Sequence, residues 1–163
     1  MKLSNLDVFL TWDDLMTLSD KFSPEWLDIH DINPNGSSIV INGEASKIGV
    51  SADWSVCLEP MESADEKCLV FQIESFELKR GFKRFLFDTF TNWGRSREGN
   101  LARMCAKAFG EGASANENQL WIDLPAFISA KGELDVRIGK VKHFRSDKRG
   151  LRLVIESAKR KGE

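Results

Sequence analysis

The chain has few of the residues that build metal and redox sites. Its 163 residues include three cysteines and two histidines. Cys57, Cys68 and Cys105 form no C-x-x-C pair, and their odd number argues against a disulfide framework. His30 and His143 stand far apart and belong to no H-x-x-x-H or H-E-x-x-H motif. We therefore predict no disulfide framework and no metal site.

The sequence also lacks the common catalytic and nucleotide-binding motifs. It has no G-x-S-x-G, no G-x-x-x-x-G-K-[ST] and no G-x-G-x-x-G string. The glycines Gly110 and Gly112 follow a predicted helix, whereas a dinucleotide-binding loop follows a strand. We therefore predict that the chain is not an enzyme, has no catalytic residues and binds no cofactor.

No apolar run approaches the roughly 20 residues that span a bilayer. The first residues, MKLSNLDVFLTWDD, are too polar for the core of a signal peptide, so we expect a cytoplasmic protein. With 42% apolar and 29% charged residues, the composition is that of a globular protein. We expect one domain over residues 1–163, with 158–163 as a disordered tail.

Acidic and basic residues are unevenly distributed along the chain. Residues 1–78 carry 15 acids and 4 bases, a net of −11, and residues 79–163 carry 10 acids and 19 bases, a net of +9. Such asymmetry is typical of contact with an anionic partner. The other interpretation is that the two halves neutralise each other within one fold.

Alternating apolar residues predict strands. The alternation is unbroken over Ile48–Leu58 and slips by one position in Leu69–Leu78, which predicts a bulge near Glu74 and Ser75. Further strands are expected over Trp26–Ile32, Ser37–Asn42, Leu120–Leu124, Leu134–Phe144 and Leu151–Ser157.

Helical spacing predicts a first helix that ends at Pro24, with Thr11 as its N-cap and Asp14 completing a capping box. A later helix is expected over Glu98–Phe109, followed by a polar loop over Gly110–Asn118. The predicted fold is α+β: a curved antiparallel sheet of about six strands packed against two or three helices.

Two segments share the pattern G-x-x-[IL]-V-I, one from Gly36 to Ile41 and the other from Gly150 to Ile155. Each follows an I-x-x-[IV] step, so both are predicted to be hairpins. The favoured explanation of the match is chance similarity between amphipathic hairpins.

The segment Lys79–Arg97 holds six basic residues and one acid. Wound as a helix at about 100° per residue, it gathers its apolar side chains within an arc of about 140°. This stripe either packs on the sheet or contacts something outside the protein, such as lipid. A third interpretation is that the helix lies in the curved sheet and one of its faces borders an apolar ligand cavity. Phe87 lies off the stripe, and basic residues crowd both ends, as in helices at anionic lipid. The stripe consists of Phe82, Phe85, Leu86, Phe90 and Trp93.

The order of these elements resembles that of LmeA-like phospholipid-binding domains, within the wider group of tubular lipid-binding folds. The resemblance rests on the first helix, Thr11–Phe22, the Gly36 and Gly150 hairpins, the strand Leu69–Leu78 and the aromatic helix. It implies a lipid-binding function. Members of that family are usually exported or lipidated, whereas this chain shows no export signal.

The leading expectation is therefore non-catalytic binding of an apolar or amphiphilic ligand, or of an anionic membrane surface. The aromatic stripe would line the apolar site, and four basic residues would meet the head group: Lys79, Arg80, Lys83 and Arg84.

The alternative is a protein–protein interaction or assembly module that uses the basic C-terminal hairpin. Its contact surface would consist of Phe87, Arg145, Lys148, Arg149 and Arg152. Nucleic acid is the least favoured partner, because Phe144 is the single aromatic residue of the hairpin that could stack on a base.

Overall fold

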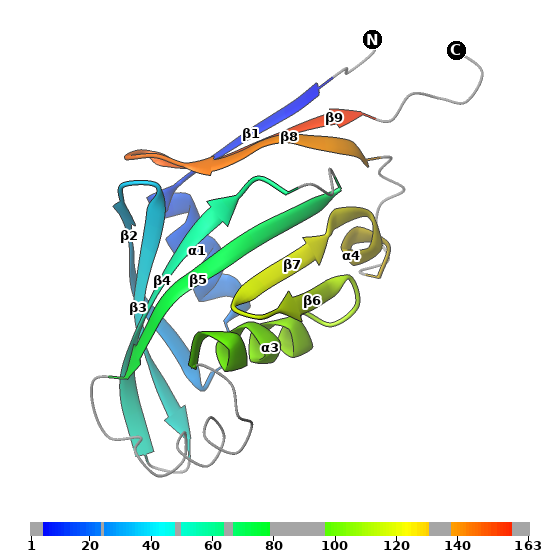
Figure 1. The fold of residues 1–163 in the computed structure, drawn as a ribbon. Helices are drawn as coiled ribbons and strands as arrows, with labels where there is room; N and C mark the ends of the chain where they lie inside the picture. Colours follow the sequence, from blue (N-terminus) through cyan, green and yellow to red (C-terminus); the bar gives the residue numbers. More distant parts are fainter. Residues whose placement is uncertain are drawn as a thin grey trace, which may run out of the picture.

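The computed structural model describes residues 5–23, 25–47, 50–63, 67–78, 97–130 and 138–157. Within these ranges the chain forms three helices and two antiparallel sheets, one of six strands and one of three (Figure 1). The predicted α+β class with a six-stranded antiparallel sheet is confirmed. The predicted aromatic helix, apart from Arg97, and the tail 158–163 lie outside the described residues.

The larger sheet has the strand order β2-β3-β4-β5-β7-β6. All neighbouring strands in it are antiparallel. Its strands are β2 (Leu27–Asn35), β3 (Ser38–Lys47), β4 (Val50–Met61), β5 (Cys68–Leu78), β6 (Ala113–Asn116) and β7 (Gln119–Asp123).

The smaller sheet joins the two ends of the chain. It contains β1 (Asn5–Thr11), β8 (Ile138–Ser146) and β9 (Gly150–Ser157), in the order β1-β9-β8. This sheet lies across one end of the larger sheet, and both termini leave from it (Figure 1). The sequence did not predict β1, so the second sheet is a finding of the structure.

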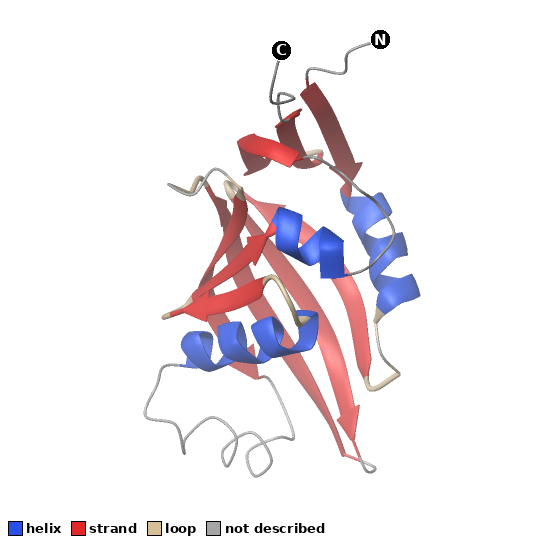
Figure 2. Cartoon of the chain, turned by 90° about the vertical axis from the view of Figure 1, so that its right-hand side faces the viewer, coloured by secondary structure: helices blue, strands red, loops and turns tan. Residues whose placement is uncertain are grey.

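Helix α1 (Trp12–Phe22) begins with the predicted capping box. The Asp14 amide donates to Thr11 Oγ1 at 3.1 Å, and the Thr11 amide donates to Asp14 Oδ2 at 2.9 Å. The hydrogen bond from the Thr11 amide stabilises the Asp14 carboxylate and lowers the pKa of that carboxyl. The helix packs beside β2, the edge strand of the larger sheet (Figure 2).

Helix α3 (Arg97–Phe109) confirms the predicted helix over Glu98–Phe109 and packs on β5, β6 and β7. The short helix α4 (Leu124–Ala130) was not predicted. It follows β7 directly, and its Ala126 amide donates to Asp123 Oδ1 at 3.0 Å. The carboxylate of Asp123 thus caps α4 where the sequence suggested only the end of a strand.

The apolar core has two parts. In one, Val56, Ile73 and Phe76 of the larger sheet are buried against Ala102 of α3. In the other, Leu120 and Ile122 of β7 and Leu124 of α4 pack with Ile155 of β9, so this part joins the two sheets. Phe144 of β8 stands edge-on to Phe71 of β5 with ring centroids 5.0 Å apart, which adds a second contact between the sheets.

The predicted bulge is confirmed. Cys57 pairs with Ser75 and Leu58 with Ile73, so Glu74 is the extra residue on β5. The predicted loop Gly110–Asn118 is wrong in part, because residues Ala113–Asn116 form β6. The small side chain of Ala115 packs against the core cluster that contains Ala102 of α3. This contact allows a largely polar segment to form a strand beside the helix.

Both segments with the shared G-x-x-[IL]-V-I pattern belong to hairpins, as predicted. Their turns lie side by side, since Ser146 Oγ donates to the Ser37 carbonyl oxygen at 2.7 Å. The two glycines serve different purposes. Gly36 has φ +66°, a backbone conformation that favours glycine, whereas Gly150 has no positive φ and lies close to β1.

Candidate interaction surface on the three-stranded sheet

The three-stranded sheet has one apolar face and one charged face. Leu153, Ile155 and Val141 point toward the core that joins the two sheets. The residues between them point outward. We use the term hairpin face for these outward residues and the β8–β9 turn: Asp7, Phe9, Lys142, His143, Arg145, Lys148, Arg149, Arg152, Val154 and Glu156.

Register places two arginines next to each other on this face. Arg152 on β9 pairs with Arg145 on β8 and, on its other side, with Phe9 on β1. Like charges directly opposite each other in an antiparallel pair are destabilising unless an anion compensates them. Phe9 is 43% exposed beside them, so the row ends in an accessible aromatic ring.

Asp7 compensates one of the two arginines. Arg152 Nε donates to Asp7 Oδ1 at 3.0 Å, and the Nη2 group forms a second, shorter hydrogen bond to Oδ2. This fork lowers the pKa of the Asp7 carboxyl, so the carboxylate persists below the usual range of aspartate. The acidic N-terminal half of the chain thus neutralises the hairpin at Arg152.

The remaining cations of the turn are exposed. Arg145, Lys148 and Arg149 have exposed side chains, and no carboxylate among the described residues forms an ion pair with them. Asp147, the one acid of the turn, accepts instead from the Arg149 and Gly150 amides at 2.7 and 3.2 Å. Residues 145–152 therefore carry four bases and one acid, a net of +3.

Neighbouring elements hold the turn in place. The indole Nε1 of Trp12, the first residue of α1, donates to the Lys148 carbonyl oxygen at 3.2 Å. Ser146 is tied to Ser37, as described above. The cations of the turn thus project from a fixed backbone, which limits the entropy lost when they bind a partner.

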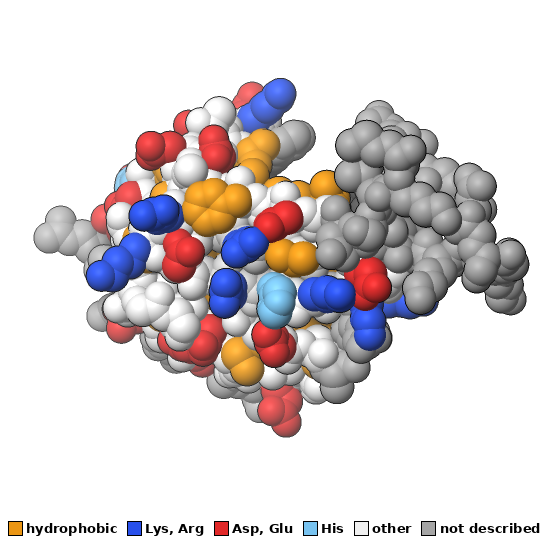
Figure 3. Space-filling model, turned by 90° about the horizontal axis from the view of Figure 1, so that it is seen from above, with side chains coloured by type: hydrophobic (Ala, Val, Ile, Leu, Met, Phe, Trp, Pro, Cys, Tyr) orange, Lys and Arg blue, Asp and Glu red, His pale blue; other side chains and the backbone are white. Residues whose placement is uncertain are grey.

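Acidic side chains are interspersed with the basic ones on this face (Figure 3). Lys142 Nζ lies 3.4 Å from Glu156 Oε2, and His143 Nδ1 lies 4.0 Å from Glu62 Oε1 at the end of β4. Apolar side chains also reach the surface between the charges (Figure 3). The hairpin face thus carries both acidic and basic side chains, with an excess of positive charge at the turn.

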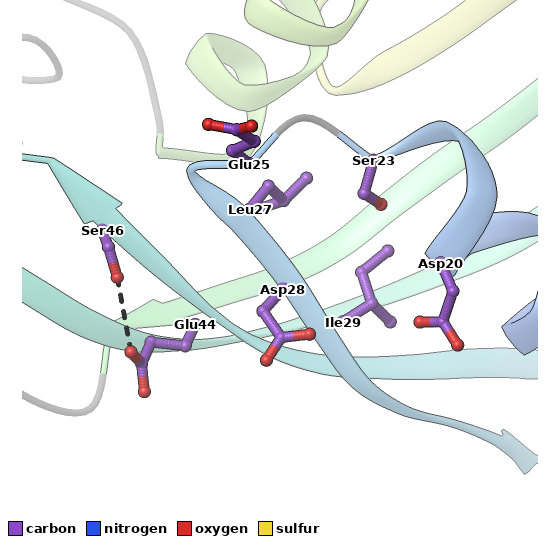
Figure 4. Close-up of a pocket in the computed structure, with 8 residues that line it drawn as sticks. All are labelled: Asp20, Ser23, Glu25, Leu27, Asp28, Ile29, Glu44 and Ser46. Atoms are coloured by element: carbon purple, nitrogen blue, oxygen red, sulfur yellow. Dashed lines mark hydrogen bonds between the residues drawn. The ribbon is translucent and has the colours of Figure 1, made fainter.

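Apart from the hairpin face, a groove lies between the C-terminal end of α1 and strands β2 and β3 (Figure 4). This open groove has a volume of about 450 Å³. Ser46 Oγ donates to Glu44 Oε1 at 3.4 Å within it. Four carboxylates, from α1, β2, β3 and the turn between α1 and β2, line it: Asp20, Glu25, Asp28 and Glu44. Among the described residues, no group of three or more His, Cys, Asp and Glu side chains could hold a metal ion.

The thiols of Cys57 and Cys105 are poorly suited to nucleophilic chemistry. Burial raises the pKa of the Cys57 thiol, and the hydrogen bond that its Sγ donates to Glu74 Oε2 at 3.3 Å raises it further. Burial also raises the pKa of the Cys105 thiol. Both side chains are therefore protonated at neutral pH, whereas a cysteine nucleophile must be a thiolate.

The structure brings together four of the predicted contact residues, Arg145, Lys148, Arg149 and Arg152, on one surface. Sequence reasoning missed Asp7 and Phe9, because these residues come from the strand that was not predicted. The nine residues predicted to bind lipid and Phe87 lie outside the described residues.

Searches against protein-family models, curated proteins and solved structures found no match to this chain. The resemblance to LmeA-like domains therefore stays a prediction. None of the helices in the described ranges is long and apolar enough to cross a membrane.

Proposed function

We propose that this chain is a non-catalytic binding module and that its hairpin face binds an acidic region of a partner protein. The observation that supports this most directly is the pair Arg145 and Arg152. The two arginines are neighbours in register, and only Arg152 has a carboxylate partner among the described residues. Asp7 compensates the charge of Arg152 alone. An acidic group of the partner would compensate the charge of Arg145 as well.

The mixed charge of the face favours a protein over a bilayer or a nucleic acid. Asp7, Glu62 and Glu156 stand among the cations and would repel a uniformly anionic surface. A protein partner can match a pattern of both signs, because its own charges alternate. The exposed ring of Phe9 beside the arginines supplies the apolar contact that protein interfaces favour.

The first prediction concerns charge reversal at the turn. We expect wild-type protein to bind poly-L-glutamate at low ionic strength and the double variant Arg145→Glu, Arg149→Glu to bind at least about tenfold more weakly. Isothermal titration calorimetry measures both affinities. Binding should fall steeply as salt rises from about 20 to 300 mM, because exposed charges are screened.

The matched control is Lys21→Glu with Lys107→Glu, which changes the net charge equally on exposed side chains of α1 and α3. This variant should keep most of the affinity. Equal losses in both variants would mean that net charge alone drives binding and would overturn the assignment to the hairpin face. The partner of the hairpin face would instead be a membrane or a nucleic acid if Arg145→Glu, Arg149→Glu lost more affinity for phosphatidylserine vesicles or for duplex DNA than for poly-L-glutamate.

We propose lipid binding by the segment Lys79–Arg97 as a second candidate function. Its support is the sequence pattern of an aromatic stripe flanked by six basic residues. The segment shares no residue with the hairpin face, so the two candidate sites can be tested by separate substitutions.

The second prediction is that Phe85→Glu with Phe90→Glu abolishes binding to vesicles that contain anionic lipid and leaves the chain folded. Co-sedimentation measures binding, and circular dichroism checks the fold. Because neither substitution changes a residue of the hairpin face, most of the affinity for poly-L-glutamate should be kept. If the two substitutions unfold the protein, the stripe is part of the core and lipid binding is ruled out.

A further inference from the structure

The two sheets have four edge strands within the described ranges: β1, β8, β2 and β6. An unblocked edge is a template for pairing with another chain, and proteins usually protect it. Bulges, prolines, charges, short length and covering helices are the common means of protection. The four edges differ sharply in this respect.

Three of the four edges are protected. Strand β2 has a register shift between Ile29 and Asp31, contains Pro34 and lies beside α1. Strand β6 is four residues long and lies against α3. Strand β8 has two register shifts and carries Lys140 and Lys142. Each would disfavour the addition of a further strand.

Strand β1 is the least protected of the four. Its seven residues pair with β9 in continuous register, without a bulge. It contains no proline and no lysine, and Asp7, its one charged residue, is held by Arg152 of β9. Leu6 and Phe9 on this strand are 52% and 43% exposed, so the edge is both regular and apolar.

We infer that β1 is an interface for a second copy of this chain, which pairs β1 with β1 in antiparallel orientation about a twofold axis. Among the described residues, no strand pairs with β1 on the side away from β9. Pairing centred on Val8, the middle of the strand, uses all seven residues. The two three-stranded sheets would then form one continuous sheet of about six strands.

The sequence of β1 is complementary to itself in this arrangement. Leu6 would lie opposite the second copy's Leu10, and Val8 opposite the second copy's Val8, so that apolar side chains meet on the inner face. On the outer face Asp7 would lie opposite the second copy's Phe9. Each Asp7 remains paired with Arg152 of its own copy, so no unpaired like charges approach each other.

Sedimentation velocity tests this interface. We expect wild-type protein to approach twice its 18.4 kDa mass as the concentration rises. A range from about 5 to 500 μM covers the affinity of a small strand-edge contact. Leu6→Lys with Phe9→Lys should keep the chain monomeric, because both side chains are exposed and charged edges resist pairing.

The control is Leu18→Lys with Met104→Lys, which places the same charges at apolar side chains of α1 and α3 that are 40% and 43% exposed. This variant should still dimerise. A wild-type chain that stays monomeric up to about 500 μM would overturn the proposal. So would a dimer that persists in the Leu6→Lys, Phe9→Lys variant, because the contact would then lie elsewhere.

A second measurement locates the axis. In an antiparallel pair centred on Val8, the two Val8 Cα atoms would be about 4.5 to 5.5 Å apart, within the range of a disulfide. The Val8→Cys variant should therefore form a covalent dimer on mild oxidation, whereas wild-type protein with its three cysteines should not. Equal cross-linking of the two proteins would contradict pairing at Val8. The hairpin-face variant Arg145→Glu, Arg149→Glu should dimerise normally, because neither residue lies on β1. The absence of a β1 dimer would therefore leave the proposed function of the hairpin face unaffected.

Discussion

Replacing Gly150 with alanine is expected to lower the free energy of unfolding by roughly 3 kcal/mol. Gly150 pairs with Thr11 at the end of the β1–β9 ladder. A Cβ atom there would collide with the Leu10 carbonyl oxygen and would come within 2.9 Å of Thr11 Cα. Both contacts are to backbone, so no side chain can rotate away and β1 itself must shift. Urea denaturation followed by tryptophan fluorescence measures the loss.

The other glycine of the shared pattern provides the control. Nothing lies within 4 Å of a Cβ atom added at Gly36, but its φ is +66°. Gly36→Ala should therefore cost about 1 kcal/mol from backbone conformation alone. Gly36→Asn should cost less, because asparagine tolerates this conformation.

Hydrogen exchange separates the two effects. Gly150→Ala should increase exchange in β1 and β9, whereas Gly36→Ala should leave these strands protected. The contrary result would be similar losses of stability for the two alanine variants, with β1 still protected in Gly150→Ala. The close approach of the β1 backbone would then not be the reason for glycine at position 150.

The sequence predicted those features that depend on local chemistry. The Thr11 capping box, the helix over Glu98–Phe109 and the bulge at Glu74 all involve residues within a few positions of one another. The shift in the alternation of β5 was sufficient to place the bulge, because each step along a strand turns the side chain to the opposite face.

The second sheet could not be predicted in the same way, because its strands come from opposite ends of the chain. Leu6, Val8 and Leu10 alternate, and that alternation was the available signal for β1. Recognising its partner requires contacts across nearly the whole chain, such as the one between Asp7 and Arg152, which are 145 positions apart.

The same limit applies to the candidate site. The sequence identified the basic residues of the hairpin because Arg145, Lys148, Arg149 and Arg152 are close in the chain. It could not separate their roles. Arg152 is paired with Asp7, whereas the other three are exposed without a carboxylate partner in the described part of the chain. It also left open whether the charged halves meet, and Asp7 with Arg152 shows one place where they do.

Truncating Phe144 to alanine is expected to lower the free energy of unfolding by about 3 to 5 kcal/mol. Phe144 is 4% exposed and stands at 88° to the Phe71 ring, in the layer between the two sheets. Its removal would leave a cavity that the backbone of two hydrogen-bonded sheets cannot readily close. The edge-on ring contact, worth about 1 kcal/mol, would be lost as well.

Phe9→Ala is the matched control, since Phe9 lies on the opposite face of the same three-stranded sheet and is 43% exposed. It should cost less than about 1 kcal/mol. Urea denaturation of both variants gives the comparison, and hydrogen exchange of the Phe144→Ala variant should show its largest increase in β1, β8 and β9. If the six-stranded sheet lost protection equally, the two sheets would unfold as one cooperative unit. If Phe144→Ala lost no more stability than Phe9→Ala, the buried side chains of β7 and β9 would hold the two sheets together without Phe144.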